Sequence, residues 1–215
     1  IHRTDNYLFA VSMYSERIQN TEIMNDENRF GWHQNNGMTY IYDSDQDQYT
    51  DNFWNTVNPL RLPGTTVVPV NIGNGTPDSS GYAQGGDYLS DQSWVGGSTI
   101  GNYGISGMAF SGVTRSGGTG STLPYAPNLQ GKKSWFMFDD EIVALGAGIT
   151  NSGMSLPVET TVENRRLGEN ADNVFTVDGQ ATNLAVKAAD LTDLVDRSAD
   201  VSGTAFEDVQ WAHLE

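Results

Sequence analysis

The amino-acid sequence predicts an all-β protein built as a large antiparallel β-sandwich, and three observations support this prediction. First, Gly accounts for 24 of the 215 residues and aromatic residues for 10%. Second, short segments rich in aromatic and β-branched side chains are separated by Gly, Asn and Asp, which favour turns. Third, some of these segments are apolar on both faces, as expected for strands inside stacked sheets.

Eight segments have the pattern of strands. In the run KSWFMF, Trp135 and Met137 fall on one face and Phe136 and Phe138 on the other, because side chains alternate along a strand. The run EIVALGAGI is also apolar on both faces, and its glycines allow close approach of neighbouring chains. The predicted strands are residues 7–15, 38–42, 64–70, 105–113, 133–140, 141–149, 158–165 and 173–177.

Three regions lack a strand pattern. Residues 71–104 form a long stretch rich in Gly, Ser, Asp and Asn, and loops of such length are usually functional or insertions. Residues 116–133 are predicted to form a second flexible loop. Residues 183–200 have the spacing of an amphipathic helix, late in a chain that is otherwise rich in strands.

The composition argues against several classes of function. Acidic residues outnumber basic ones 27 to 11, which gives a net charge of −16; a nucleic-acid surface needs a basic stripe instead. There is no Cys, so disulfides and thiolate metal sites are excluded. The three His are too far apart to have the ligand spacing of a zinc site. No apolar run approaches the roughly 20 residues of a membrane helix.

Both ends of the chain lie within strand-like sequence, at IHRTDNYLFAVSMYSERI and at VQWAHLE. A natural module is expected to begin and end in linkers. We therefore expect residues 1–215 to be one central β-sandwich domain of a longer polypeptide, truncated at both ends.

A dense polar stretch contains Glu22 and, three residues later, Asn25. Asn donates and accepts hydrogen bonds without carrying charge, so it can hold a carboxylate or a sugar hydroxyl. A nearby carboxylate can orient an Arg or Tyr and tune its protonation. Asn and Asp also supply turns at strand ends, and from spacing alone the turn interpretation is favoured.

Three consecutive carboxylates, Asp139, Asp140 and Glu141, follow the apolar run SWFMF. Ca²⁺ takes six to eight oxygen ligands and suits such a cluster when backbone carbonyls and a distant carboxylate assist. A solvated turn between two strands explains the same residues equally well. The residues alone leave both interpretations open.

Exposed aromatic rings can serve as platforms for sugar rings. Most aromatic residues of a β-sandwich belong to its core. Trp94 and Tyr103 lie within the Gly-rich stretch and are therefore the best candidates for exposed, sugar-binding rings. Taken together, the residues indicate a carbohydrate-associated β domain, either part of an enzyme or a non-catalytic binding or structural module.

The chain also resembles polysaccharide lyase family 8, which contains hyaluronate, chondroitin AC and xanthan lyases. The matching segments follow in order along the chain, with the xanthan-lyase branch most similar at FDDEIVALGAGI and ETTVENR. They are SMYSERI, E-x-x-N-x-EN, GMTYIY, RLPGTT, KSWFMFDDEIVALGAGI, VETTVENR and WAHLE.

This resemblance implies β-elimination on an acidic, uronate-containing polysaccharide, with xanthan as the best guess, by a secreted bacterial enzyme. It implies that the catalytic Asn, His and Tyr lie in an α/α toroid outside this chain. The toroid and a C-terminal β portion would then be partners of this domain. By resemblance, Glu22 supports the active-site Arg and Tyr, and Asn25 reaches the substrate cleft.

The resemblance further implies that Asp139, Asp140 and Glu141 contribute to a structural Ca²⁺ site. A further ligand is expected after residue 215. The elimination reaction itself needs no metal in this family and no organic cofactor is expected.

Overall fold

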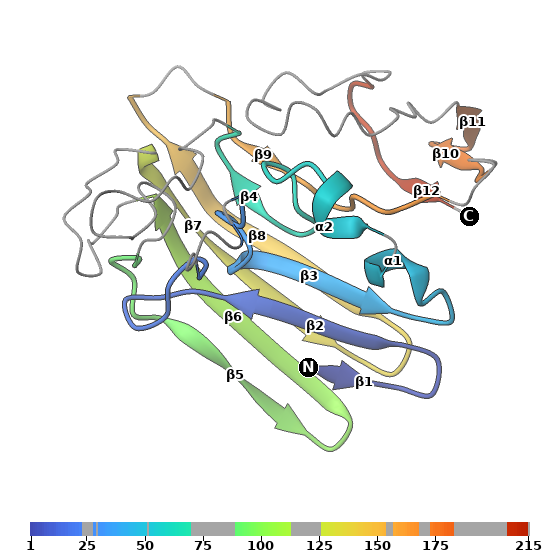
Figure 1. The fold of residues 1–215 in the computed structure, drawn as a ribbon, viewed down its shortest axis with the longest axis horizontal. Helices are drawn as coiled ribbons and strands as arrows, with labels where there is room; N and C mark the ends of the chain where they lie inside the picture. The colour runs from blue at the N-terminus through green and yellow to red at the C-terminus, as the bar shows by residue number, and fades with distance from the viewer. Residues whose placement is uncertain are drawn as a thin grey trace.

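The computed structural model describes residues 1–22, 28, 30–50, 52–69, 89–112, 126–153, 157–167, 173–182 and 206–214. Within them, strands predominate and every strand pair is antiparallel. The predicted all-β class is therefore confirmed. Two larger sheets lie across one another, with shorter elements beside them (Figure 1).

The first sheet has the order β1-β2-β3 and is formed by β1 (His2–Arg3), β2 (Leu8–Met13) and β3 (Asn36–Tyr42). In the middle strand, Phe9 pairs with His2 on one side and Ile41 on the other. Phe9 points into the core between the two sheets. Met38 lies in a separate cluster, so the first sheet buries apolar side chains on both faces.

The second sheet has the order β5-β6-β7-β8. Its strands are β5 (Val95–Ile100), β6 (Tyr103–Gly112), β7 (Ala126–Met137) and β8 (Ile142–Asn151). The shorter elements are α1 (Asp47–Thr50), α2 (Phe53–Thr56), β4 (Thr66–Val67), β9 (Glu159–Thr160), β10 (Phe175–Val177), β11 (Gln180–Thr182) and β12 (Ala212–Leu214).

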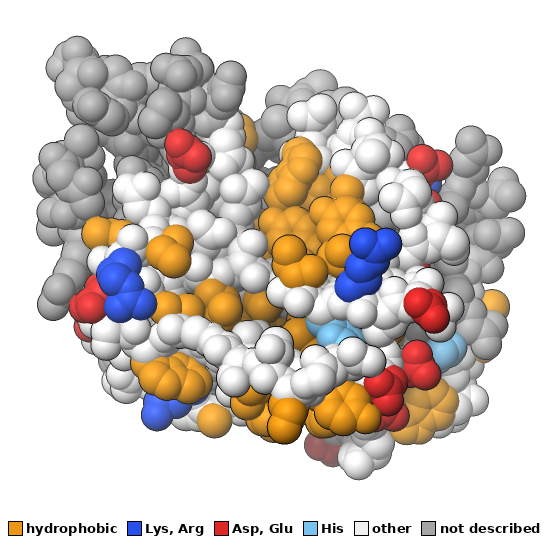
Figure 2. Space-filling view, turned by 90° about the horizontal axis from the view of Figure 1, so that it is seen from below, with side chains coloured by type: hydrophobic (Ala, Val, Ile, Leu, Met, Phe, Trp, Pro, Cys, Tyr) orange, Lys and Arg blue, Asp and Glu red, His pale blue; other side chains and the backbone are white. Residues whose placement is uncertain are grey.

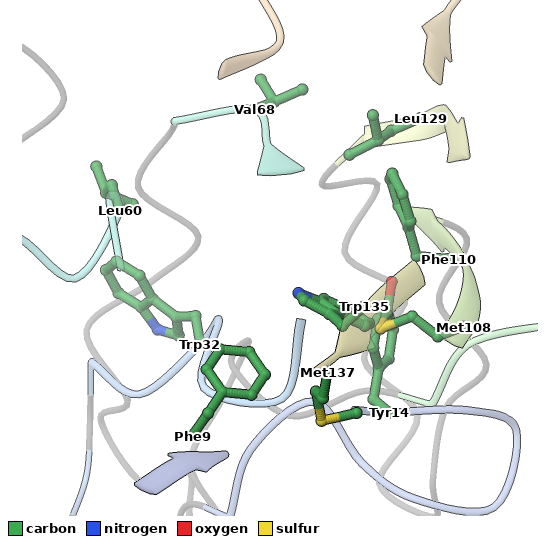
Figure 3. Packing of buried hydrophobic residues seen from close by; sticks show 10 residues of the cluster. All are labelled: Phe9, Tyr14, Trp32, Leu60, Val68, Met108, Phe110, Leu129, Trp135 and Met137. Atoms are coloured by element: carbon green, nitrogen blue, oxygen red, sulfur yellow. The ribbon is translucent and has the colours of Figure 1, made fainter. Parts of the chain in front are cut away.

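The main core lies between the two larger sheets. Figure 3 shows side chains from β2, β6 and β7 directed toward one another around Trp135. Burying each such large apolar side chain contributes about 1.5–3 kcal/mol relative to exposure. The cluster consists of Phe9, Tyr14, Trp32, Leu60, Val68, Met108, Phe110, Leu129, Trp135 and Met137.

The outer faces of the two sheets differ. The outer face of the first sheet is covered by a smaller cluster that joins Met38 to Phe53 of α2. On the second sheet, Leu145 is 54% exposed and Val143 40% exposed. Trp135 and Met137 are buried as predicted, but Phe138 is 40% exposed. No described element covers the outer face of this sheet, so the prediction that stacked sheets cover both faces of KSWFMF was wrong for the described residues.

The Gly-rich stretch contains a strand that the sequence pattern did not predict. Residues 95–100 form β5, which pairs with β6 along its whole length. A Cβ on Gly97 would lie 2.6 Å from the carbonyl oxygen of Ile105, so the close pairing itself requires a glycine. Composition therefore misled the prediction here, because pairing outweighs strand propensity.

Other boundaries also moved. Part of the predicted loop at 116–133 is strand, because β7 begins at Ala126. The predicted strands at 64–70 and 158–165 shorten to β4 and β9, which form a two-stranded sheet within the described residues. The helix predicted at 183–200 lies outside the described residues.

Gly64, in the turn before β4, is held in a left-handed conformation with φ of 79°. A Cβ there would lie 2.7 Å from Thr39 Cγ2 and 2.9 Å from the Gly37 carbonyl oxygen. We expect Gly64→Ala to lower the free energy of unfolding by about 3 kcal/mol, through backbone strain and overpacking together. Urea denaturation of the chain measures this loss.

Gly101 provides the control, because its φ is 58° but a Cβ at this position would have no contact within 4 Å beyond its chain neighbours. Gly101→Ala should cost only the backbone term, about 1 kcal/mol. Equal losses for the two variants would contradict the role of close packing at Gly64.

Lys133 is a buried cation in the core, only 6% exposed. Its ammonium group donates a hydrogen bond to the carbonyl oxygen of Gly64 and lies 5.7 Å from the centre of the Trp135 ring. No carboxylate of the described residues forms an ion pair with it. Burial lowers the pKa of Lys133 from 10.5 to about 8, because the charged form loses its hydration.

This pKa shift predicts a pH dependence of stability. Between pH 8 and 10.5 the unfolded chain binds more protons at Lys133 than the folded chain does, so stability rises with pH there. Burial raises the pKa of Tyr49 from 10.0 to about 12, which reverses the trend above pH 10. We expect a gain on the order of 2 kcal/mol from pH 8 to 10 in urea denaturation.

Lys133→Met should flatten this rise, because the titrating group is gone. Lys132→Met is the matched control, since Lys132 is adjacent and exposed. If the stability of Lys133→Met rose with pH as steeply as that of the wild type, the assignment to Lys133 would be wrong.

Candidate functional site

The connection between β2 and β3 carries the polar stretch singled out in the sequence. Asn28 adopts a left-handed φ of 54° and its side-chain amide reaches three acceptors. Nδ2 lies 3.0 Å from Thr21 Oγ1, 2.9 Å from the Glu22 carbonyl oxygen and 2.9 Å from Gln34 Oε1. A Cβ on Gly31 would collide with the Asn28 side chain at 2.4 Å. This loop is therefore held by Asn turn chemistry.

Other amides of the stretch have the same role. The Asn20 side chain donates to the Trp32 carbonyl oxygen, and the Asn35 side chain donates to that of Gln19 at 2.8 Å. Asn36 Nδ2 lies 3.2 Å from His33 Nδ1. Burial lowers the pKa of His33 from 6.5 to about 3, so this imidazole is neutral at physiological pH and is structural.

Glu22 is the residue of the predicted pair that the structure describes. Its side chain is exposed, while its backbone carbonyl is fixed by the Asn28 amide. The loop thus presents a solvent-accessible carboxylate from a backbone whose position does not depend on that carboxylate. Asn25 lies outside the described residues.

Gln34 also belongs to this site, although no sequence pattern indicated it: its Nε2 donates to Asn28 Oδ1 at 3.2 Å, and its Oε1 accepts from Asn28 Nδ2. The two amides therefore clamp the loop across six residues. The only sequence signal for this contact is that Gln34 follows Asn28 by six residues, with Gly31 between them. Such spacing does not distinguish Gln34 from an ordinary surface Gln.

Trp94 and Tyr103 are exposed, at 54% and 45% respectively, as the sequence predicted. The Trp94 ring lies over Gly107, where a Cβ would come within 2.8 Å of it. The rings of Tyr103 and Phe138 are packed edge to face, with their centres 5.9 Å apart. The Tyr103 hydroxyl donates a hydrogen bond to Asp139 Oδ2 at 3.3 Å. The structure therefore brings Tyr103 to the acidic turn. Sugar binding by these rings stays a prediction.

The acidic residues Asp139, Asp140 and Glu141 form the exposed turn between β7 and β8. The turn is closed by a hydrogen bond from the Phe138 amide to the Glu141 carbonyl oxygen at 2.9 Å. The Tyr7 hydroxyl donates to the Asp139 carbonyl oxygen at 3.5 Å. Partial burial, followed by the charges of Asp140 and Asp139, raises the pKa of Tyr7.

These carboxylates do not form a cation site by themselves. Within the part of the chain that the structure describes, no group of three or more His, Cys, Asp or Glu side chains is arranged to hold a metal. Ca²⁺ needs six to eight oxygen ligands, so three residues of one exposed turn do not complete its coordination. The calcium site stays a prediction that depends on a further ligand.

Comparison with known proteins identifies the family. A profile of "Polysaccharide lyase family 8, super-sandwich domain" matches residues 1–215. The chain belongs to polysaccharide lyase family 8. A family 8 relative, the xanthan lyase of Bacillus sp. (strain GL1), is 41% identical over 184 residues, covering 85% of this chain and 17% of the relative.

Two further comparisons agree. The hyaluronate lyase of Thermasporomyces composti is 36% identical over 220 residues, covering 100% of this chain and 23% of that protein. The solved structure of Paenibacillus xanthan lyase superposes with a TM-score of 0.64 at 44% identity, covering 83% of this chain and 15% of that one. The chain thus spans less than a quarter of the length of these family 8 proteins. In the described residues, no helix is long and apolar enough to cross a membrane.

Proposed function

We propose that this chain is the β-sandwich part of a lyase that cleaves uronate-containing acidic polysaccharides by β-elimination, with xanthan as the favoured substrate. Membership of family 8 over residues 1–215 is the observation that carries the proposal. The similarity to xanthan lyases in both sequence and structure supports the choice of substrate.

β-Elimination removes the proton on C5 of the uronate and expels the glycosidic oxygen on C4. The reaction requires that the uronate carboxylate be neutralised, and it requires a base and an acid at the cleaved bond. In our proposal this chain contributes Glu22, whose accessible carboxylate orients an Arg of the adjoining domain. Asn25 would contact the substrate in the same cleft.

The partners that follow from this proposal are the α/α toroid and the C-terminal β portion of the same enzyme. The several-fold greater length of the relatives supports such partners. Because the substrate is a polymer that does not cross membranes, we also propose that the enzyme is secreted by a bacterium.

The test is the ultraviolet absorbance of the conjugated unsaturated uronate, followed while the intact enzyme is incubated with xanthan, hyaluronan or chondroitin. We expect absorbance to rise with at least one polymer, and fastest with xanthan. If no polymer gives the absorbance but one still binds, the chain is a non-catalytic binding or structural module instead.

We further propose that Asp139, Asp140 and Glu141 bind a structural Ca²⁺ in the intact enzyme, together with a carboxylate from outside this chain. Chelation should then lower the melting temperature of the intact enzyme, because ligand binding to the folded state stabilises it. Addition of Ca²⁺ in excess should restore the original value, and Asp139→Asn should abolish both shifts. An unchanged melting temperature on chelation would count against the site.

A further inference from the structure

A groove of about 590 Å³ lies between the edges of the two larger sheets, where β1 and β2 face β5 and β6. Its volume is within the range of small-molecule sites, about 300–1,000 Å³. In the view from below, hydrophobic side chains gather in the middle of the face, beside a basic side chain and a histidine (Figure 2). Val11, Met13 and Met137 provide apolar lining.

Two residues that line this groove each have a buried polar atom with no hydrogen-bond partner among the described residues. These atoms are Nε2 of His2, in a side chain 7% exposed, and Oγ of Ser106, in a side chain 8% exposed. Leaving a buried polar group unsatisfied costs about 1–3 kcal/mol, and most such groups in folded proteins have partners. Two of them on one groove indicate that a polar ligand supplies the missing hydrogen bonds.

The remaining lining narrows the chemistry of that ligand. Ser98 and Thr99 add hydroxyl groups, and Arg3, which is exposed, adds a positive charge. Within the described residues, Arg3 forms no ion pair with a carboxylate. The groove therefore offers an apolar surface, several neutral hydrogen-bonding groups and a single guanidinium group. A sugar ring has apolar C–H faces and hydroxyl edges, and a uronate adds a carboxylate that suits Arg.

Backbone glycines keep this groove open. Gly97 pairs with Ser106 across the two strands, and a Cβ on Gly97 would lie 2.6 Å from the Ile105 carbonyl oxygen. Gly104, also in the lining, would bring a Cβ to 3.4 Å from Met137 Cε. A side chain at Gly97 would take up space beside Ser106, 3.3 Å from its Cβ, and one at Gly104 would take up space beside Met137.

We propose that this groove binds a uronate-bearing sugar unit of an acidic oligosaccharide, with His2, Ser106 and Arg3 as its polar contacts. The site is separate from the loop that carries Glu22, and occupancy of the groove requires no bond cleavage. The class of ligand rests on the proposed function, whereas the existence of a polar ligand rests on the groove itself.

Met13 and Met137 provide a local readout, because both line the groove. In the intact enzyme carrying Glu22→Gln, with ¹³C-labelled Met methyl groups, a hyaluronan tetrasaccharide should shift the signals of these two residues. The signal of Met38 should stay in place, because Met38 is buried in the cluster on the other face of the first sheet. Shifts confined to other methionines would overturn the proposal.

Variants then test the polar contacts. We expect Ser106→Ala and Arg3→Gln each to weaken binding about tenfold in the methyl titration. Ser106→Ala should not lower the melting temperature of the free protein, because its hydroxyl has no partner among the described residues to lose. Arg17→Gln, at an exposed position outside the groove lining, is the control and should bind as the parent does.

A neutral glucan tetrasaccharide should bind at least tenfold more weakly if Arg3 recognises the uronate carboxylate. Equal binding of the two probes would overturn the assignment to a uronate, and unchanged affinity in both Arg3→Gln and Ser106→Ala would overturn the site. Arg3 is exposed, so its variant tests the site even if Ser106→Ala misfolds. Normal cleavage with unchanged methionine signals would reject the groove alone, while binding without any cleavage would reject the lyase proposal alone.

Discussion

In the intact enzyme, Glu22→Gln is expected to reduce turnover by more than about tenfold while leaving the melting temperature nearly unchanged. The carboxylate is exposed, and the Asn28 amide holds the Glu22 backbone whichever side chain is present. Gln keeps the shape of Glu but removes the charge that, in our proposal, orients and tunes an adjoining Arg. Initial rates of unsaturated-uronate formation and thermal unfolding measure the two quantities.

Asn25→Ala should have an effect of similar size on turnover, as expected for a residue at the substrate. Glu207→Gln is the matched control, because Glu207 is exposed and remote in sequence from the loop. A large fall in melting temperature, with activity per folded molecule intact, would instead mean that Glu22 and Asn25 serve only the turn. That is the interpretation favoured by spacing alone.

Trp135→Ala is expected to lower the free energy of unfolding by about 3–5 kcal/mol. Trp135 is 1% exposed and lies at the centre of the main core (Figure 3). The ammonium group of Lys133 lies over the Trp135 ring. Gly37 packs against the same ring so closely that a Cβ added to it would lie 3.2 Å from Trp135 Cη2. Truncation would leave a cavity and remove the cation–π contact together.

The control is Trp94→Ala, because Trp94 is 54% exposed. Its replacement should change the free energy of unfolding by no more than about 0.5 kcal/mol. Urea denaturation of both variants gives the comparison. Similar losses at the two positions would mean that Trp135 does not dominate the packing between the sheets.

The fold class was predictable because most of the strands are apolar segments bounded by turn residues, a pattern that is visible in the sequence. The segments that contain Met108 and Trp135 are rich in large apolar side chains and are bounded by turn residues. They form β6 and β7, the two central strands of the second sheet. β5 was not predictable, because its Gly, Ser and Thr side chains bury little surface. It exists because its backbone pairs with β6.

The candidate site also has features that the sequence could predict and features that it could not. Turn chemistry was predictable from composition, and Asn28 and Asn20 indeed hold the loop. The role proposed for Glu22 came from family resemblance instead, because the proposed chemistry involves residues outside this chain. The buried Ser106 Oγ, which has no hydrogen-bond partner among the described residues, has no sequence signature, because its burial depends on how the folded strands pack.

The buried imidazole of His33 also limits the conditions under which the domain is stable. Its pKa in the folded state is about 3, against 6.5 for a free side chain. Between these pH values His33 is protonated in the unfolded chain but neutral in the folded chain, so acidification favours unfolding. Acidification from about pH 6.5 toward pH 3 therefore removes progressively more of the stability of this domain, and the main core must supply what remains.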